Sequence, residues 1–290
     1  GIARATALEL LRDYPEQSHL TALPNLLQDA DPLVRGAAAR YLEVTDPQVR
    51  YSLGMPLLDD PARVVRLEAA RTLAALIRYE LPDAERERLN SALGAYRMSQ
   101  SVNAERPESH LNIGLLETAQ GKAAMAQKAY RTALRLDPEF VPAYANLADL
   151  YRALGSDTEG EVMLRRGLEI APENADLQHA LGLLHIRAKR LDKAATALRR
   201  AAELAPHNAR YAYVYALTLT QAGDPEGALQ VLAEAYSRHP TDRSILVALA
   251  TISRDASRHS DALSYAQALR RRYPDDPDAA TLVRELTPGN

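Results

Sequence analysis

The chain has 290 residues, of which 47% are hydrophobic, so it can bury a core and is not an intrinsically disordered segment. Lys and Arg total 35 and Asp and Glu total 38, and the resulting net charge of −3 argues against a dominant nucleic-acid-binding surface, which needs a basic stripe. Because the sequence has no cysteine, it excludes disulfides, thiolate metal sites, covalent haem attachment and a cysteine nucleophile.

The sequence shows neither a membrane span nor a secretion signal. No run approaches the roughly 20 apolar residues that a membrane-spanning helix needs, so we expect no membrane insertion. The first residues, Gly1-Ile2-Ala3, already have a helical pattern rather than that of a signal peptide. We therefore expect the natural protein to extend upstream of Gly1, which makes an upstream domain of the same polypeptide one candidate partner.

A pattern in the N-terminal 80 residues recurs at an offset of 31 residues. Val34-Arg35 followed by Ala38-Ala39-Arg40 matches Val65-Arg66 followed by Ala69-Ala70-Arg71, and Ala3-Arg4 lies one step back. The recurrence predicts about three short helical repeats, of which the first is truncated.

Two Asp-Pro pairs, Asp31-Pro32 and Asp60-Pro61, come before the second helix of two of these repeats. Asp is a good N-cap and Pro suits the first helical turn. With the Val-Arg pairs, this pattern resembles HEAT repeats, in which such a turn opens the second helix. The resemblance implies HEAT-like helical repeats over residues 1–80.

The segment 81–106 is interpreted as a junction helix, a degenerate repeat, with one helix over residues 83–103. Ala92 and Tyr96 fall where positions 20 and 24 of a further 34-residue unit would lie. Gly, Ser and Pro are not enriched here, so the segment is not a flexible linker. We expect the two repeat arrays to join as one continuous superhelix.

Prolines in the second half of the chain are spaced at intervals of 34 residues: Pro138, Pro172, Pro206, Pro240 and Pro274. Repeats of this length predict a helical solenoid. When each proline is counted as position 32, five units cover residues 107–274 and start at Pro107, Val141, Ala175, Ala209 and Arg243.

Two amphipathic helices are predicted in each unit, because apolar residues recur at spacings of three and four. Position 8, on the first helix, is small throughout: Gly114, Ala148, Gly182, Ala216 and Ala250. Position 24, on the second helix, is bulky in four units: Tyr130, Leu164, Leu198 and Leu232. The two helices are therefore expected to pack closely, with Gly121, Gly155 and Gly223 at turns that need a positive φ.

This pattern resembles the tetratricopeptide repeat family over residues 107–274. The resemblance implies an all-α fold, a right-handed α–α superhelical solenoid of helix-turn-helix repeats. One departure is position 4, usually a large aromatic residue in the family, which is Tyr144 in one unit and His110, Gln178, Ala212 and Leu246 in the others. Residues 275–290 are expected to form a C-terminal capping helix, Pro277 to Leu286, and a tail.

In this family the concave surface, formed by the first helices, binds peptides or other proteins. The resemblance therefore implies a non-catalytic scaffold, with a protein or peptide as partner. First-helix positions that face away from the second helix give the candidate partner-binding residues: Asn146, Asp149, Arg152, His179, Leu183, Arg210, Tyr213 and Leu217. The alternative for each is a solvated side chain or a bond between neighbouring helices.

Signatures of catalysis and of cofactor binding are missing from the sequence. The seven His include no HExxH pattern and no i, i+4 pair, so we expect no metal site. Neither a phosphate-binding glycine loop nor a GxSxG motif occurs. We therefore expect no enzyme activity, no cofactor and no nucleic-acid partner.

Two other functions stay open. The arrangement resembles the C-terminal repeat region of bacterial multi-haem c-type cytochromes, which implies a regulatory or assembly segment of a larger exported enzyme, in the bacterial periplasm. A self-associating structural array is the third hypothesis, and sedimentation of the purified chain would test it.

Overall fold

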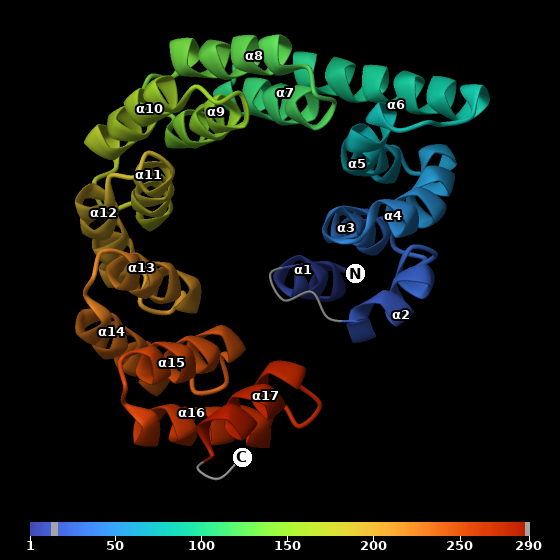
Figure 1. Cartoon of the computed structure of the whole chain (residues 1–290). Helices are drawn as coiled ribbons and strands as arrows, with labels where there is room; N and C mark the ends of the chain where they lie inside the picture. Colours follow the sequence, from blue (N-terminus) through green and yellow to red (C-terminus); the bar gives the residue numbers. More distant parts are fainter. Residues whose placement is uncertain (13–16, 288–290) are drawn as a thin grey trace. The chain divides into compact units, whose positions relative to one another are not determined.

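The computed structural model describes residues 1–12 and 17–287, and within these residues every regular element is a helix. The chain divides into two compact units, Gly1–Leu150 and Tyr151–Asn290, which are described separately. The predicted all-α class and the architecture of repeated helix pairs are confirmed (Figure 1). The last residues of the expected tail, 288–290, lie outside the described residues.

The first unit contains eight complete helices and most of α9. They are α1 (Ile2–Leu11), α2 (Gln17–Leu26), α3 (Pro32–Tyr41), α4 (Pro47–Gly54), α5 (Arg63–Leu73), α6 (Asp83–Ser101), α7 (Pro107–Ala119), α8 (Ala123–Leu136) and α9 (Val141–Ala153). Short 3₁₀ helices follow α3, α4 and α5, at Leu42–Val44, Met55–Asp59 and Ala74–Arg78.

The second helices of the N-terminal repeats stack on one another. α1 contacts α3, and α3 contacts α5. Val34 and Val65, which open α3 and α5 at the same repeat position, are both fully buried in one apolar core. The repeated apolar face thus makes a continuous core, as stacking of short repeats requires.

The two Asp-Pro pairs differ in the structure. Asp31 caps α3, since its carboxylate accepts a hydrogen bond from Leu33 N at 2.9 Å. Asp60 does not cap α5, which begins at Arg63, although it accepts from Ala62 N at 2.8 Å. Its carboxylate is instead held by both arms of the Arg35 guanidinium, at 2.8 and 2.9 Å, so Asp60 joins two repeats.

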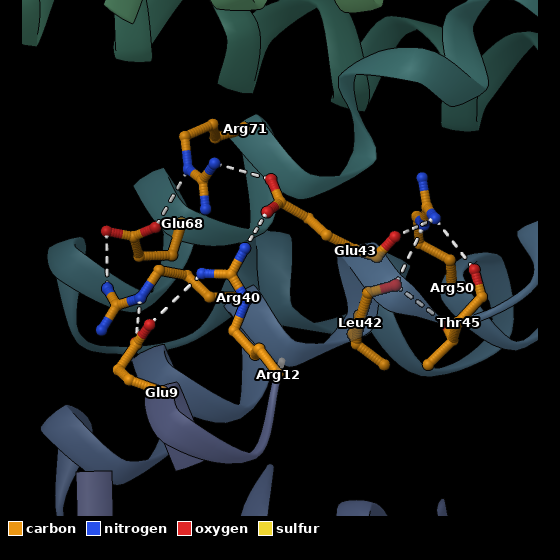
Figure 2. Close-up of polar contacts among 9 residues, drawn as sticks. All are labelled: Glu9, Arg12, Arg40, Leu42, Glu43, Thr45, Arg50, Glu68 and Arg71. Carbon is orange, nitrogen blue, oxygen red and sulfur yellow. Dashed lines mark hydrogen bonds and ion pairs between the residues drawn. The ribbon is translucent and has the colours of Figure 1, made fainter. Parts of the chain in front are cut away.

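An ion-pair ring, defined by six alternating charges, lies across the three N-terminal repeats (Figure 2). Its members in order around the ring are Glu9, Arg40, Glu68, Arg71, Glu43 and Arg12, and the last pairs again with Glu9. The side chains are 22–35% exposed, so water screens them only in part. Equal numbers of both signs leave the ring without net charge.

Beside the ring, Arg50 of α4 closes the end of the helix that precedes it (Figure 2). Its guanidinium donates hydrogen bonds to the carbonyl oxygens of Leu42, Glu43 and Thr45, at 3.1, 2.6 and 2.9 Å. The Leu42 carbonyl also accepts from Thr45 N at 3.1 Å and from the Thr45 hydroxyl at 2.7 Å, so Arg50 adds a charged donor to a helix end that is already closed by Thr45.

The junction helix α6 covers Asp83–Ser101, close to the predicted range 83–103, and contacts α5 and α7. Arg97 of α6 donates to Glu117 of α7 at 2.7 Å and to Gln120 at 2.9 Å. Glu117 is buried, so this arginine neutralises a carboxylate that would be costly to bury alone. The junction is therefore a packed element of the first unit.

The second unit begins with the end of α9 and alternates second and first helices. Its further helices are α10 (Asp157–Ile170), α11 (Ala175–Arg187), α12 (Leu191–Leu204), α13 (Ala209–Gln221), α14 (Pro225–Arg238), α15 (Arg243–Asp255), α16 (His259–Arg272) and α17 (Pro277–Leu286). Each helix contacts the next from α10 to α17, and α13 also contacts α15 (Figure 1). The last helix has the bounds predicted for the closing helix.

Sequence accounts for where the first helices of this unit begin. Asn or Asp residues spaced by 34 cap α11, α13, α15 and α17 through side-chain oxygens that accept from the first turn: Asn174, Asn208, Asp242 and Asp276. The same period that aligns the prolines thus sets the helix starts.

The turns inside the 34-residue units share one backbone conformation. Gly121, Gly155 and Gly223 have φ of 75°, 74° and 89°, which confirms the predicted turn glycines. The equivalent residues of the other two units, Lys189 and Ser257, have φ of 55° and 62°. Because the turn geometry is common to all five units, two residues with a Cβ adopt a conformation that favours glycine.

Candidate functional site

The eight predicted partner-binding residues divide between the two units. Asn146 and Asp149 lie on the part of α9 that belongs to the first unit. The Asn146 amide donates to Pro142 O of its own helix at 2.8 Å, and Asp149 is exposed. Arg152, at the end of α9 in the second unit, is exposed as well.

The other five predicted residues lie on α11 and α13. Arg210 and Leu217 are exposed, and Tyr213 and Leu183 are partly buried. We use the name first-helix face for these four side chains together with Asp242 and Ser244 at the start of α15. The face contains a cation, a phenol and apolar carbons.

His179 does not belong to that exposed set. Its side chain is only 9% exposed, and its ring stacks on Tyr211 with centroids 4.5 Å apart. Burial and the nearby Arg210 charge lower the pKa of His179, so the imidazole is neutral at pH 7. The sequence placed His179 among the partner-facing residues; the structure corrects this, because the ring fills the space between α11 and α13.

Tyr211 links the same two helices a second time. Its hydroxyl donates to the carboxylate of Asp176 on α11, while its ring covers His179. Burial and the bonded Asp176 raise the pKa of Tyr211, so the phenol stays protonated. Tyr211 and His179 therefore fix the position of α13, and with it the side chains of Arg210 and Tyr213.

Arg210 and Tyr213 come together at a cavity of about 290 Å³ between α13 and the start of α15. Asp242 and Ser244 complete the polar lining of this cavity, and Ala209 and Val214 supply apolar atoms. The Arg210 guanidinium forms no salt bridge or hydrogen bond to any residue that the structure describes. A cation, a carboxylate, a phenol and a hydroxyl can therefore receive a polar group from a second molecule.

Sequence reasoning did not select Asp242. The residue precedes its unit by one position, and its Oδ1 accepts from Ile245 N at 3.0 Å as the cap of α15. Asn and Asp recur in the sequence at 34-residue intervals, and this spacing predicts a carboxylate or amide at the N-terminus of each first helix. Asp242 could have been identified from that spacing.

The described ranges contain neither a candidate metal site nor a candidate membrane span. Nowhere in residues 1–12 and 17–287 do three or more His, Cys, Asp or Glu gather in a way that could hold a metal ion. No helix of these ranges has the length and apolar character that crossing a bilayer requires.

Comparisons with known protein families place repeats along most of the chain. A model of HEAT repeats matches residues 2–74, and a model of the tetratricopeptide repeat matches residues 111–175. A model of the TPR domain of cytochrome c-type biogenesis protein H matches residues 158–280. None of the three describes a catalytic domain.

Solved structures with a similar fold include three repeat proteins. A MamA protein has a TM-score of 0.52 at 19% identity, over 58% of this chain and 92% of that one. YrrB, described as a TPR protein with an unusual peptide-binding site, has 0.52 at 21% identity, over 64% and 96%. PilF of Pseudomonas aeruginosa has 0.52 at 19%, over 66% and 84%.

At such identities the likeness concerns the fold alone, and a search of curated protein sequences finds no match. The family models, the 34-residue helix pairs and the structural neighbours agree with one another. The chain therefore has HEAT repeats over residues 2–74 and tetratricopeptide repeats over residues 111–280.

Proposed function

We propose that the chain is a non-catalytic scaffold that binds an extended segment of another protein on its first-helix face. The observation that carries the proposal is the cavity of about 290 Å³ at which Arg210, Tyr213, Asp242 and Ser244 converge. Arg and Tyr are the residue types that most often dominate the free energy of protein–protein binding.

Apolar contact area accompanies these polar groups. Leu217 on α13 is 40% exposed, one helical turn beyond Tyr213. Its counterpart at the same repeat position in the first unit, Leu115 on α7, is 39% exposed. The exposed Leu217, on the same helix as the unpaired Arg210 guanidinium, suits a partner segment that has both apolar and polar side chains.

The family supports the same function. Tetratricopeptide solenoids present extended surfaces, and one structural neighbour, YrrB, is described as having a peptide-binding site. Asp149 and Arg152 on α9 are further exposed candidates for partner contact, each within its own unit.

The test is selection of linear peptides from a displayed library on the full chain, followed by titration of the enriched peptides. Arg210→Glu and Tyr213→Ala should each weaken binding about tenfold or more, as at interface hot spots. Arg271→Glu on α16 is the control, an exposed arginine of a second helix that should leave affinity unchanged. Undiminished binding by Arg210→Glu and Tyr213→Ala would remove the first-helix face from the proposal.

A second candidate is an assembly or regulatory segment of a larger enzyme, such as an exported multi-haem cytochrome. Residues 158–280 match the TPR domain of cytochrome c-type biogenesis protein H. This match favours the second candidate, because the name of that protein refers to the biogenesis of c-type cytochromes. The test is the haem absorption spectrum of the complete natural gene product after denaturation. A haem-free product would eliminate the cytochrome and leave the scaffold proposal standing.

A further inference from the structure

A second cavity in the unit Tyr151–Asn290, of about 450 Å³, lies on a different surface. It opens between the second helices α10 and α12, over the side of α11 that carries Gln178, Leu181 and His185. These residues occupy positions 4, 7 and 11 of their repeat, whereas the first-helix face uses other positions. We call it the outer cavity.

Side-chain size explains why the outer cavity exists. In the preceding repeat, positions 4 and 11 are Tyr144 and Tyr151, and both are buried, with 7% and 6% exposure. In this repeat the same positions are Gln178 and His185, which have smaller side chains. Two missing phenol rings leave volume that the surrounding helices do not fill.

Positive charge surrounds the outer cavity. Its charged lining residues are Arg165, Lys193, Arg199, Arg200 and Glu203. Lys193 forms no salt bridge or hydrogen bond within the described residues, and Arg199 and Arg200 share Glu203 at 3.9 and 3.5 Å. Arg200 also pairs with the exposed Glu173 at 3.8 Å, and Arg165 pairs with Glu161 at 2.7 Å. Among the described residues Lys193 has no carboxylate partner and Arg199 has only the shared Glu203, so the lining keeps an excess of positive charge that attracts an anion.

The deeper wall of the outer cavity combines apolar atoms with an unpaired imidazole. Leu181 and Ala197 are buried, and His185 is only 2% exposed. Its buried Nδ1 has no hydrogen-bond partner, although buried polar atoms in proteins nearly always have one. Burial and the charge of Arg190 lower the pKa of His185, so the ring is neutral and has one N–H donor and one acceptor nitrogen.

Neighbouring cavities between second helices lack this excess of cations. The cavity between α12 and α14 has Arg199 and Arg238 against three carboxylates: Glu203, Asp224 and Glu234. The cavity between α14 and α16 has Arg258 against Glu226 and Asp261. Among these three cavities the excess of cations is therefore confined to the outer cavity, which suits a compact ligand and not an acidic chain that extends over several cavities.

We propose that the outer cavity binds a small anion: a phosphate or carboxylate group carried by an apolar body. The anionic group lies among Lys193, Arg199 and Arg200, and the apolar body lies on Leu181 and Ala197 beside His185. A volume of about 450 Å³ falls within the range of roughly 300–1,000 Å³ that is typical of small-molecule sites. This site is separate from the first-helix face and does not depend on the proposed scaffold function.

Four probes test the proposal: phenyl phosphate, benzoate, inorganic phosphate and benzyl alcohol, titrated to about 10 mM at low salt. The readout is the imidazole NMR signal of His185 in the full chain with labelled histidine, compared with exposed His259 on α16. Phenyl phosphate, benzoate or both should shift His185 alone, and the preferred one identifies the anionic group. Inorganic phosphate should bind about tenfold more weakly than phenyl phosphate, because it lacks the apolar body.

Two variants distinguish binding in the outer cavity from nonspecific attraction of anions to the protein surface. Lys193→Gln combined with Arg199→Gln should reduce the affinity at least about tenfold, since charge-assisted hydrogen bonds are lost. Arg166→Gln is the matched control, because Arg166 is exposed on α10 next to Arg165 but does not line the cavity. Equal binding of benzyl alcohol, equal loss in both variants, or no shift of His185 with either aromatic anion would each overturn the proposal.

Discussion

Gly182 of α11 lies directly against Leu198 of α12: a Cβ atom built on Gly182 would stand 2.5 Å from Leu198 Cγ. Leu198 is fully buried and cannot move aside. Gly182→Ala should therefore lower the free energy of unfolding by about 1–3 kcal/mol, the usual cost of overfilling a core. The effect should appear in urea unfolding, although alanine favours helix over glycine by about 1 kcal/mol.

The control for this substitution is Gly94 in α6. Gly94 is also inside a helix, but a Cβ built there would meet no atom within 4 Å. Gly94→Ala should therefore raise the free energy of unfolding by up to about 1 kcal/mol, from helix propensity alone. If both alanines changed stability in the same direction, close contact of the two helices would not be the reason for glycine at position 182.

The left-handed turn at Lys189 gives a second prediction. Its φ of 55° costs a residue with a Cβ about 1 kcal/mol, so Lys189→Gly should stabilise the chain by about 0.5 kcal/mol after the greater entropy of unfolded glycine is subtracted. Lys189→Ala keeps the strained backbone and should give no such gain. Thermal unfolding of the two variants under one condition checks this, and equal melting temperatures would refute it.

The sequence predicts the repeat pairs well because their signals are local and periodic. Turn glycines, proline stops and small residues at position 8 each act within a few residues of the chain. Lys189 and Ser257 could be recognised as turn residues only through the 34-residue spacing, since neither side chain indicates a positive φ. There the period outweighs the preference of the individual residue.

The sequence pattern alone does not predict the interactions between repeats. His179 occupies a position that faces a partner in a simple helix projection, but Tyr211, 32 residues later, covers it. The sequence predicts Asp60 as an N-cap, but its carboxylate instead accepts hydrogen bonds from Arg35, 25 residues earlier. Such contacts depend on how consecutive repeats are stacked, which a pattern within one repeat does not specify.

The ion-pair ring gives a third prediction. Glu43 pairs with Arg12 at 2.7 Å and with Arg71 at 2.6 Å, so Glu43→Gln breaks two pairs and opens the ring. The free energy of unfolding should fall by about 1 kcal/mol at low salt. This value is at the upper end of the contributions that partly exposed ion pairs make to stability, because the pairs of the ring form a network. The loss should shrink in about 1 M salt, where the screening length is about 3 Å.

Asp59→Asn is the matched control for the ring. Asp59 pairs with Arg88 in the same unit, but the Asp59 side chain is 72% exposed and belongs to no ring. Its replacement should change the urea midpoint little at any salt concentration. Equal effects of the two substitutions would mean that the closed ring contributes no more than an ordinary surface pair.

Glu161 of α10 gives a prediction about acid. Burial alone would raise the pKa of this carboxyl, but hydrogen bonds from Arg165 and Arg190, both at 2.7 Å, lower it from 4.5 to about 2. A carboxyl with a lower pKa in the folded state stabilises the protein above its unfolded pKa and loses that contribution as pH falls through the folded value. Relative to Glu161→Gln, the natural chain should therefore lose its stability advantage between pH 4.5 and about pH 2. Urea unfolding of both proteins across this range measures the difference, in which the other carboxyls cancel. A difference that stayed constant down to pH 2 would show that the two arginines do not hold Glu161 in its charged form.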